Sequence, residues 1–119
     1  MKIHAWTLVA ALTCASDAQA EESFTYTCSG GTRILPNGLA LGKVDWKFDI
    51  DPGKQRAGTT GKWVPMEINQ YRIAFPLEGK HWISITRSNG HFYAVQPIEN
   101  SERKMQEYLL YEGTCVTTQ

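Results

Sequence analysis

Val44-Asp45-Trp46-Lys47-Phe48-Asp49-Ile50-Asp51 alternates apolar and charged side chains without a break. In a β-strand, successive side chains point to opposite faces of the sheet, so this segment has one apolar face and one charged face. Strands with one face in the core and the other in water are typical of antiparallel sheets. We therefore expect an antiparallel strand over residues 44–51, with Trp46 in the core.

Further alternating segments occur along the chain. Their apolar positions are Phe24, Tyr26 and Cys28 near the start, Tyr71, Ile73 and Phe75 in the middle, and Leu109, Tyr111, Gly113 and Cys115 at the end. Residues typical of turns separate such segments, at 29–31, 36–38, 51–54, 58–61, 77–80 and 88–90. Short strands at this spacing predict an all-β fold, a small antiparallel up-and-down barrel or flattened sandwich of about seven or eight strands.

A tight hairpin is predicted at Asn89-Gly90, which separates the alternating segments 81–87 and 91–96. Asn-Gly is the strongest short-range hairpin signal because both residues tolerate positive φ angles. A two-residue loop at this position would pair Ile85 with Ala94 on the neighbouring strand.

Residues 99–108 depart from the alternation. Ser101 would cap a short helix with Met105 and Tyr108 on its apolar side and Gly113 beyond its end. A polar loop that leads into a strand is the other interpretation of the same residues. The sequence leaves both open.

Residues 1–20 have the anatomy of a secretory signal peptide. Lys2 supplies the positive start, residues 5–12 form an apolar run, and Ala18-Gln19-Ala20 is a small-residue cleavage site. The apolar run is too short to cross a membrane, which requires about 20 residues. We expect cleavage between Ala20 and Glu21, a single barrel domain over 21–119 without a transmembrane segment, and a periplasmic or secreted location.

Cleavage would remove Cys14 and leave one cysteine pair, Cys28 and Cys115. A lipid anchor on Cys14 is the alternative, but Thr13 is bulky where such an anchor site needs glycine or alanine. Two cysteines in an exported chain indicate a disulfide. This bond would join the first and last predicted strands, and closing so long a loop stabilises a fold by about 4.5 kcal/mol in the chain-entropy model.

The sequence predicts no catalytic residues, no metal site and no cofactor. His81 and His91 lie at opposite ends of the predicted hairpin, too far apart to share a metal ion or a proton. Asp45, Asp49 and Asp51 share a strand face, but a strand spaces them about 7 Å per step, which does not suit a calcium site. The formal net charge of +0 disfavours nucleic acid and anionic membranes as partners.

Candidate partner-binding residues lie around the hairpin and among the tryptophans. Arg87, Ser88 and His91 flank the predicted turn, where an arginine can donate two hydrogen bonds to a carboxylate. Trp82 has the opposite parity from the isoleucines of its strand and should face outward, whereas Trp63 lies outside any clear alternation. Exposed tryptophans are frequent binding hot spots. The alternatives are that Trp82 covers the end of the barrel and that Arg87 pairs with a carboxylate on a neighbouring strand.

The chain resembles small periplasmic β-barrels, including the membrane-bound and periplasmic inhibitors of c-type lysozyme. The resemblance rests on a signal peptide, a Tyr26-x-Cys28 opening strand, a Gly113-x-Cys115 closing strand and a neutral barrel domain. It implies inhibition by a loop with a serine and a basic residue that enters the lysozyme cleft. Residues 84–90 carry serines and an arginine near a tight turn, in a different order from that of the family.

These observations predict an exported, non-catalytic binding protein, an inhibitor of an extracellular hydrolase such as lysozyme. A barrel that binds a small molecule or lipid in its mouth is the first alternative, and a small hydrolase is the second. The barrel interior discriminates the first two. A filled interior favours binding at the surface, and an open one favours an internal ligand.

Overall fold

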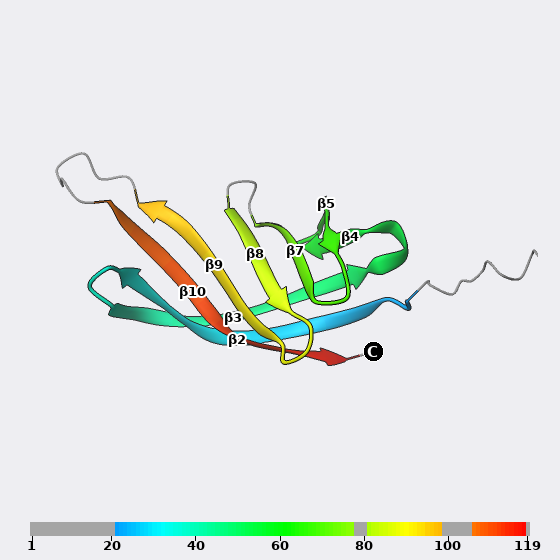
Figure 1. The fold of residues 1–119 in the computed structure, drawn as a ribbon, viewed down its shortest axis with the longest axis horizontal. Helices are drawn as coiled ribbons and strands as arrows, with labels where there is room; N and C mark the ends of the chain where they lie inside the picture. The colour runs from blue at the N-terminus through cyan, green and yellow to red at the C-terminus, as the bar shows by residue number, and fades with distance from the viewer. Residues whose placement is uncertain (1–20, 78–80, 99–105, 119) are drawn as a thin grey trace, which may run out of the picture.

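The computed structural model describes residues 21–77, 81–98 and 106–118. They form a nine-stranded, all-antiparallel sheet that curls into a nearly closed barrel (Figure 1). The strands are β2 (Phe24–Leu35), β3 (Leu39–Asp51), β4 (Arg56–Thr59), β5 (Lys62–Pro65), β6 (Glu67–Ile68), β7 (Arg72–Leu77), β8 (His81–Thr86), β9 (His91–Ile98) and β10 (Glu107–Thr118), with a 3-10 turn, η1, at Pro52–Lys54. The predicted barrel architecture is confirmed.

The order of the strands in the sheet is β5-β4-β3-β2-β10-β9-β8-β7-β6. Its two end strands, β5 and β6, are separated in the sequence by Met66 alone. The Met66 side chain is buried, and its backbone N–H donates to the Gln55 carbonyl at 3.0 Å. Pro65 has no N–H for a sheet hydrogen bond, which suits the end of β5. The chain itself therefore nearly closes the barrel, with β5 and β6 as the two arms of one bend, and this bend raises the strand number above the predicted seven or eight.

Packed side chains fill the barrel interior. The largest side chains that are fully buried are Phe75, Phe92, Ile50, Ile73, Ile83 and Ile85. Phe48 meets Phe75 edge-on with 4.9 Å between ring centroids. Trp46 packs on this core, with 5.7 Å between its ring centroid and that of Phe92. It is only partly buried, so it lies at the border of the core and not within it as predicted.

The alternation that predicts the strand over 44–51 is confirmed in β3. Val44, Phe48 and Ile50 are buried, whereas Asp45, Lys47 and Asp49 are exposed. The charged face is therefore in water along this strand, as expected for an antiparallel barrel.

The first and last described strands, β2 and β10, run side by side (Figure 1). Cys28 lies directly opposite Cys115, and the predicted disulfide joins them. Two residues further along β2, on the same face, Gly30 lies opposite Gly113. A Cβ added to Gly30 would lie 2.6 Å from the Gly113 Cα, and one added to Gly113 would lie 2.1 Å from the Ser29 carbonyl oxygen. The two backbones therefore approach so closely that only glycine fits.

The register predicted for the hairpin is wrong by two residues. Ile85 pairs with Phe92, and Ala94 pairs with Ile83 instead. The connection is a four-residue loop over 87–90, closed by a 2.8 Å hydrogen bond from the Gly90 N–H to the Thr86 carbonyl. Because the slip equals one full side-chain period, every residue keeps its predicted face.

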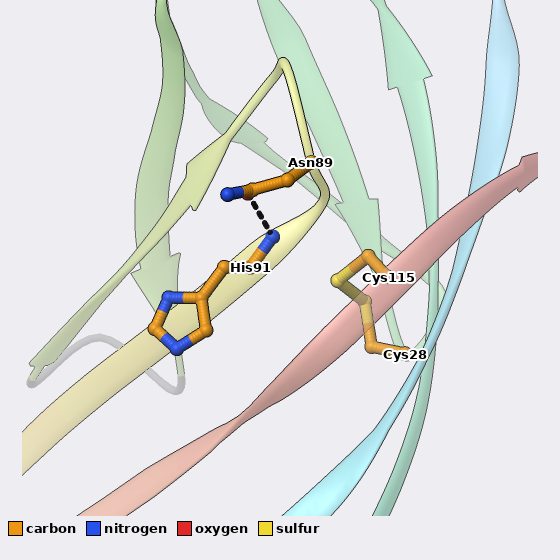
Figure 2. Close-up of a disulfide and its surroundings, with 4 residues drawn as sticks. All are labelled: Cys28, Asn89, His91 and Cys115. Carbon is orange, nitrogen blue, oxygen red and sulfur yellow. Dashed lines mark hydrogen bonds between the residues drawn. A yellow bond between two sulfur atoms is a disulfide. The ribbon is translucent and has the colours of Figure 1, made fainter.

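The wider loop results from its contact with β10. The Cys115 N–H donates to the Gly90 carbonyl at 2.7 Å, so the turn is docked beside the disulfide (Figure 2). Gly90 has φ +76°, and a Cβ there would lie 2.1 Å from the Cys115 carbonyl oxygen. This tertiary contact favours glycine and overrides the local preference for a two-residue loop.

Two predictions fall mainly on residues that lie outside the described ranges. These are the signal peptide over 1–20 and most of segment 99–108, although Glu107 and Tyr108 belong to β10. Among the residues that the structure does describe, no helix is long and apolar enough to span a membrane.

The contact between β2 and β10 predicts a large difference between two glycine-to-alanine substitutions. Gly113→Ala should lower the free energy of unfolding by about 2–3 kcal/mol, because its Cβ must displace backbone. Gly42→Ala is the matched control in β3, where an added Cβ meets nothing within 4 Å, and should change it by about 0.5 kcal/mol or less. Chemical denaturation of the oxidised variants measures both. Equal effects would contradict the close approach of the strands.

Candidate partner-binding face

Large apolar side chains gather on the outer surface of β8, β9 and β10. Trp82, Tyr93, Val95 and Tyr108 are 47%, 46%, 38% and 38% exposed, respectively. Together with Leu110 we call them the outer aromatic face. Cross-strand pairing links its members, because Val95 lies opposite Leu110. The face thus spans three adjacent strands on the side away from the core.

Polar groups lie beside these side chains on the same face. Glu112 is opposite Tyr93 in the sheet and accepts a hydrogen bond from Arg33 on β2. His91 Nε2 lies 3.7 Å from the second Glu112 carboxylate oxygen. All three side chains are more than a third exposed, so this ion-pair group contributes little to stability. It places a guanidinium, an imidazole and a carboxylate at the edge of an aromatic surface.

Arg87 is held by the protein itself. Its guanidinium donates to the Asn69 carbonyl at 2.8 Å and to the Glu21 carboxylate at 2.6 Å, and its side chain is only 21% exposed. The carboxylate partner lies just before β2, in the N-terminal segment. Burial raises the pKa of the nearby Tyr26 hydroxyl, an effect that Arg87 opposes and Glu21 reinforces. Arg87 therefore ties the loop after β8 to the N-terminal segment.

The structure brings some of the predicted binding residues together and separates others. Trp82 and His91 share the outer side of the sheet, and Ser88 is exposed in the adjoining loop. The Asn89 side chain accepts a 2.8 Å hydrogen bond from the His91 N–H and shapes this loop (Figure 2). Trp63 is 50% exposed but belongs to β5, on a separate surface.

Tyr93 and Tyr108 were not predicted as binding residues. Alternation along β9 could have indicated that Tyr93 faces outward, because it lies between the apolar, buried residues Phe92 and Ala94. Tyr108 falls in the segment for which helix and strand both remained open, so its face was undetermined by the sequence.

The two histidines lie in different environments. His81 is buried and stacks on Tyr111 with 5.7 Å between ring centroids, whereas His91 is exposed beside Glu112. Within ranges 21–77, 81–98 and 106–118, no group of three or more His, Cys, Asp or Glu side chains is arranged to hold a metal ion. The two imidazoles therefore do not belong to one site.

The chain was compared with models of known protein families, with curated proteins and with solved structures, and none of them matches. The resemblance to the lysozyme inhibitors therefore rests on layout and cysteine placement alone.

The hydrogen bonds of Arg87 predict a structural cost for its removal. Arg87→Ala should lower the free energy of unfolding by about 1–2 kcal/mol, since the Asn69 carbonyl and the Glu21 carboxylate lose a charged donor. Arg72→Ala, at an exposed position of β7, is the control and should change it by about 0.5 kcal/mol or less. Denaturation of the protein comprising residues 21–119 measures both. Unchanged stability in Arg87→Ala would return this residue to the list of partner-binding candidates.

Proposed function

We propose that this protein is an exported, non-catalytic binding protein that holds a protein partner on its outer aromatic face. The packed barrel interior carries the proposal, because Phe75, Phe92 and Ile83 are fully buried in its core. Barrels that bind an internal ligand need an open interior lined by side chains. The observation therefore favours binding at the outer surface over a lipid or small molecule in the barrel mouth.

The chemistry of the outer aromatic face supports a macromolecular partner. Trp, Tyr and Arg are the residue types that dominate binding energy at protein interfaces, and Trp82, Tyr93 and Tyr108 lie here with Arg33 close by. Aromatic side chains have few rotatable bonds, so ordering them on binding costs little entropy.

The disulfide supports an oxidising compartment outside the cytosol. Cys28 and Cys115 are buried and joined, and disulfides of this structural kind persist mainly in exported proteins. This agrees with the signal peptide predicted over residues 1–20. Catalysis is not part of the proposal, because His81 and His91 occupy separate environments, the first buried against Tyr111 and the second exposed beside Glu112.

An extracellular hydrolase is the partner class that we propose, with c-type lysozyme as the first to test. The resemblance in layout suggests it, and glycan hydrolases carry catalytic carboxylates in an open cleft. Since Arg87 is held by Asn69 and Glu21, the polar groups offered to such a cleft are the more exposed Arg33, which is paired with Glu112, and the His91 imidazole next to the exposed Ser88 loop.

Binding and inhibition of a panel of lysozymes test this function directly. The protein comprising residues 21–119 should bind and inhibit at least one c-type lysozyme, and Trp82→Ala should weaken binding at least tenfold with little change in melting temperature. Trp63→Ala is the matched control, an equally exposed tryptophan on another surface, and should leave binding unchanged.

Each outcome bears on a different part of the proposal. If no lysozyme in the panel is bound, the proposed partner class is wrong. If a lysozyme is bound but Trp63→Ala weakens it as much as Trp82→Ala does, the partner does not use the outer aromatic face.

A further inference from the structure

A second surface lies over β2, β3, β4 and β5, away from the outer aromatic face. Cross-strand pairing sets four residues in one row, with Thr25 opposite Asp49, Asp49 opposite Gly58, and Gly58 opposite Trp63. A Cβ added to Gly58 would lie 3.3 Å from Trp63 Cζ3 and 3.4 Å from the Asp49 Cβ. The side chains of Trp63 and Asp49 therefore converge over a position where the sheet carries no side chain.

A hollow of about 330 Å³ opens to solvent at this place. It is lined by Ser23, Phe24, Thr25, Asp49, Ile50 and Trp63. Binding sites for small molecules typically measure about 300–1,000 Å³, so this hollow is at the small end of the range. It combines one exposed indole with polar groups that belong to only three side chains.

The indole is held in place by neighbouring contacts. The Arg56 guanidinium carbon lies 4.1 Å from the centre of the Trp63 ring, and Arg56 Nε donates to Asp51 at 3.1 Å. Asp51 in turn accepts a hydrogen bond from the Lys54 N–H at 3.3 Å. Trp63 is therefore supported by a chain of contacts and is still 50% exposed. A side chain held in place in this way loses little conformational freedom when it binds a ligand.

We infer that this hollow binds a neutral carbohydrate, one or two sugar units in size. A sugar presents apolar C–H groups that pack on an aromatic ring, together with hydroxyls that need acceptors and donors. The Asp49 carboxylate, fixed by a 3.1 Å hydrogen bond from Thr25 Oγ1, supplies the acceptor. The Ser23 hydroxyl can donate and accept, whereas Thr25 Oγ1, whose O–H is donated to Asp49, can only accept a further hydrogen bond.

The charges around the hollow disfavour other small ligands. Asp49 is the charged side chain among its lining residues, so an anionic ligand would meet a like charge, and the guanidinium of the nearby Arg56 is already paired with Asp51. An organic cation would have to compete with the Arg56 guanidinium, which already makes a cation–π contact with Trp63, its carbon 4.1 Å from the ring centre. A neutral, hydroxyl-rich ring is the class of ligand that neither the Asp49 carboxylate nor the Arg56 guanidinium repels.

Titration by NMR of the protein comprising residues 21–119 tests this inference. The probes are chitotriose in its N-acetylated form, cellotriose and maltotriose, and the readout is the indole N–H signal of each tryptophan. At least one probe should shift the Trp63 signal, identified by its absence in Trp63→Phe, with a Kd near or below about 10 mM. The Trp82 signal should not move.

Variants of the hollow separate binding from folding. Asp49→Asn and Trp63→Ala should each weaken binding at least fivefold, whereas Lys62→Ala, at an exposed position of the same strand as Trp63, should leave it unchanged. If none of the three sugars shifts the Trp63 signal, or if Trp82 responds in its place, the inference is wrong. A stronger response to butylammonium than to any sugar would also overturn it. Lysozyme binding is measured separately, so this site and the proposed function fail independently.

Discussion

The fold depends on the close approach of β2 and β10. The Cys28–Cys115 disulfide and the facing pair Gly30 and Gly113 lie on consecutive same-face steps of these strands, so a covalent bond and a contact that admits only glycine act at one point. The loop at Gly90 is docked on Cys115 and brings β8 and β9 to the same place. The strands on both sides of the barrel are therefore positioned relative to this contact.

Both proposed surfaces depend on that framework. The outer aromatic face lies on strands next to the contact, and its ion pair joins Glu112 of β10 to Arg33 of β2 across it. The hollow beside Trp63 begins at the N-terminal end of β2 and extends over β3 to β5. Buried side chains pack in the barrel interior, so both proposed surfaces lie on the outside of the barrel rather than at its open end.

Alternation in the sequence was sufficient to predict which face most strand residues occupy, because a strand has a fixed period of two. The disulfide was predicted because removal of Cys14 with the signal peptide would leave Cys28 and Cys115 as one pair. Alternation could not predict features that depend on distant residues. The hairpin register is set by the docking of Gly90 on Cys115, and the partner of Arg87 is Glu21, which lies 66 residues away. The hollow beside Trp63 requires Gly58 to face it across the sheet, which the pattern around Trp63 does not reveal.

The contact between β2 and β10 is tested most directly by removing the disulfide. The Cys28→Ala/Cys115→Ala protein, compared with the oxidised parent by denaturation and native-state hydrogen exchange, should lose about 2–5 kcal/mol of unfolding free energy. The amides of β10 should lose protection before those of β7 and β8, because they are next to the lost bond. Unchanged stability, with β10 protected as in the parent, would contradict the account.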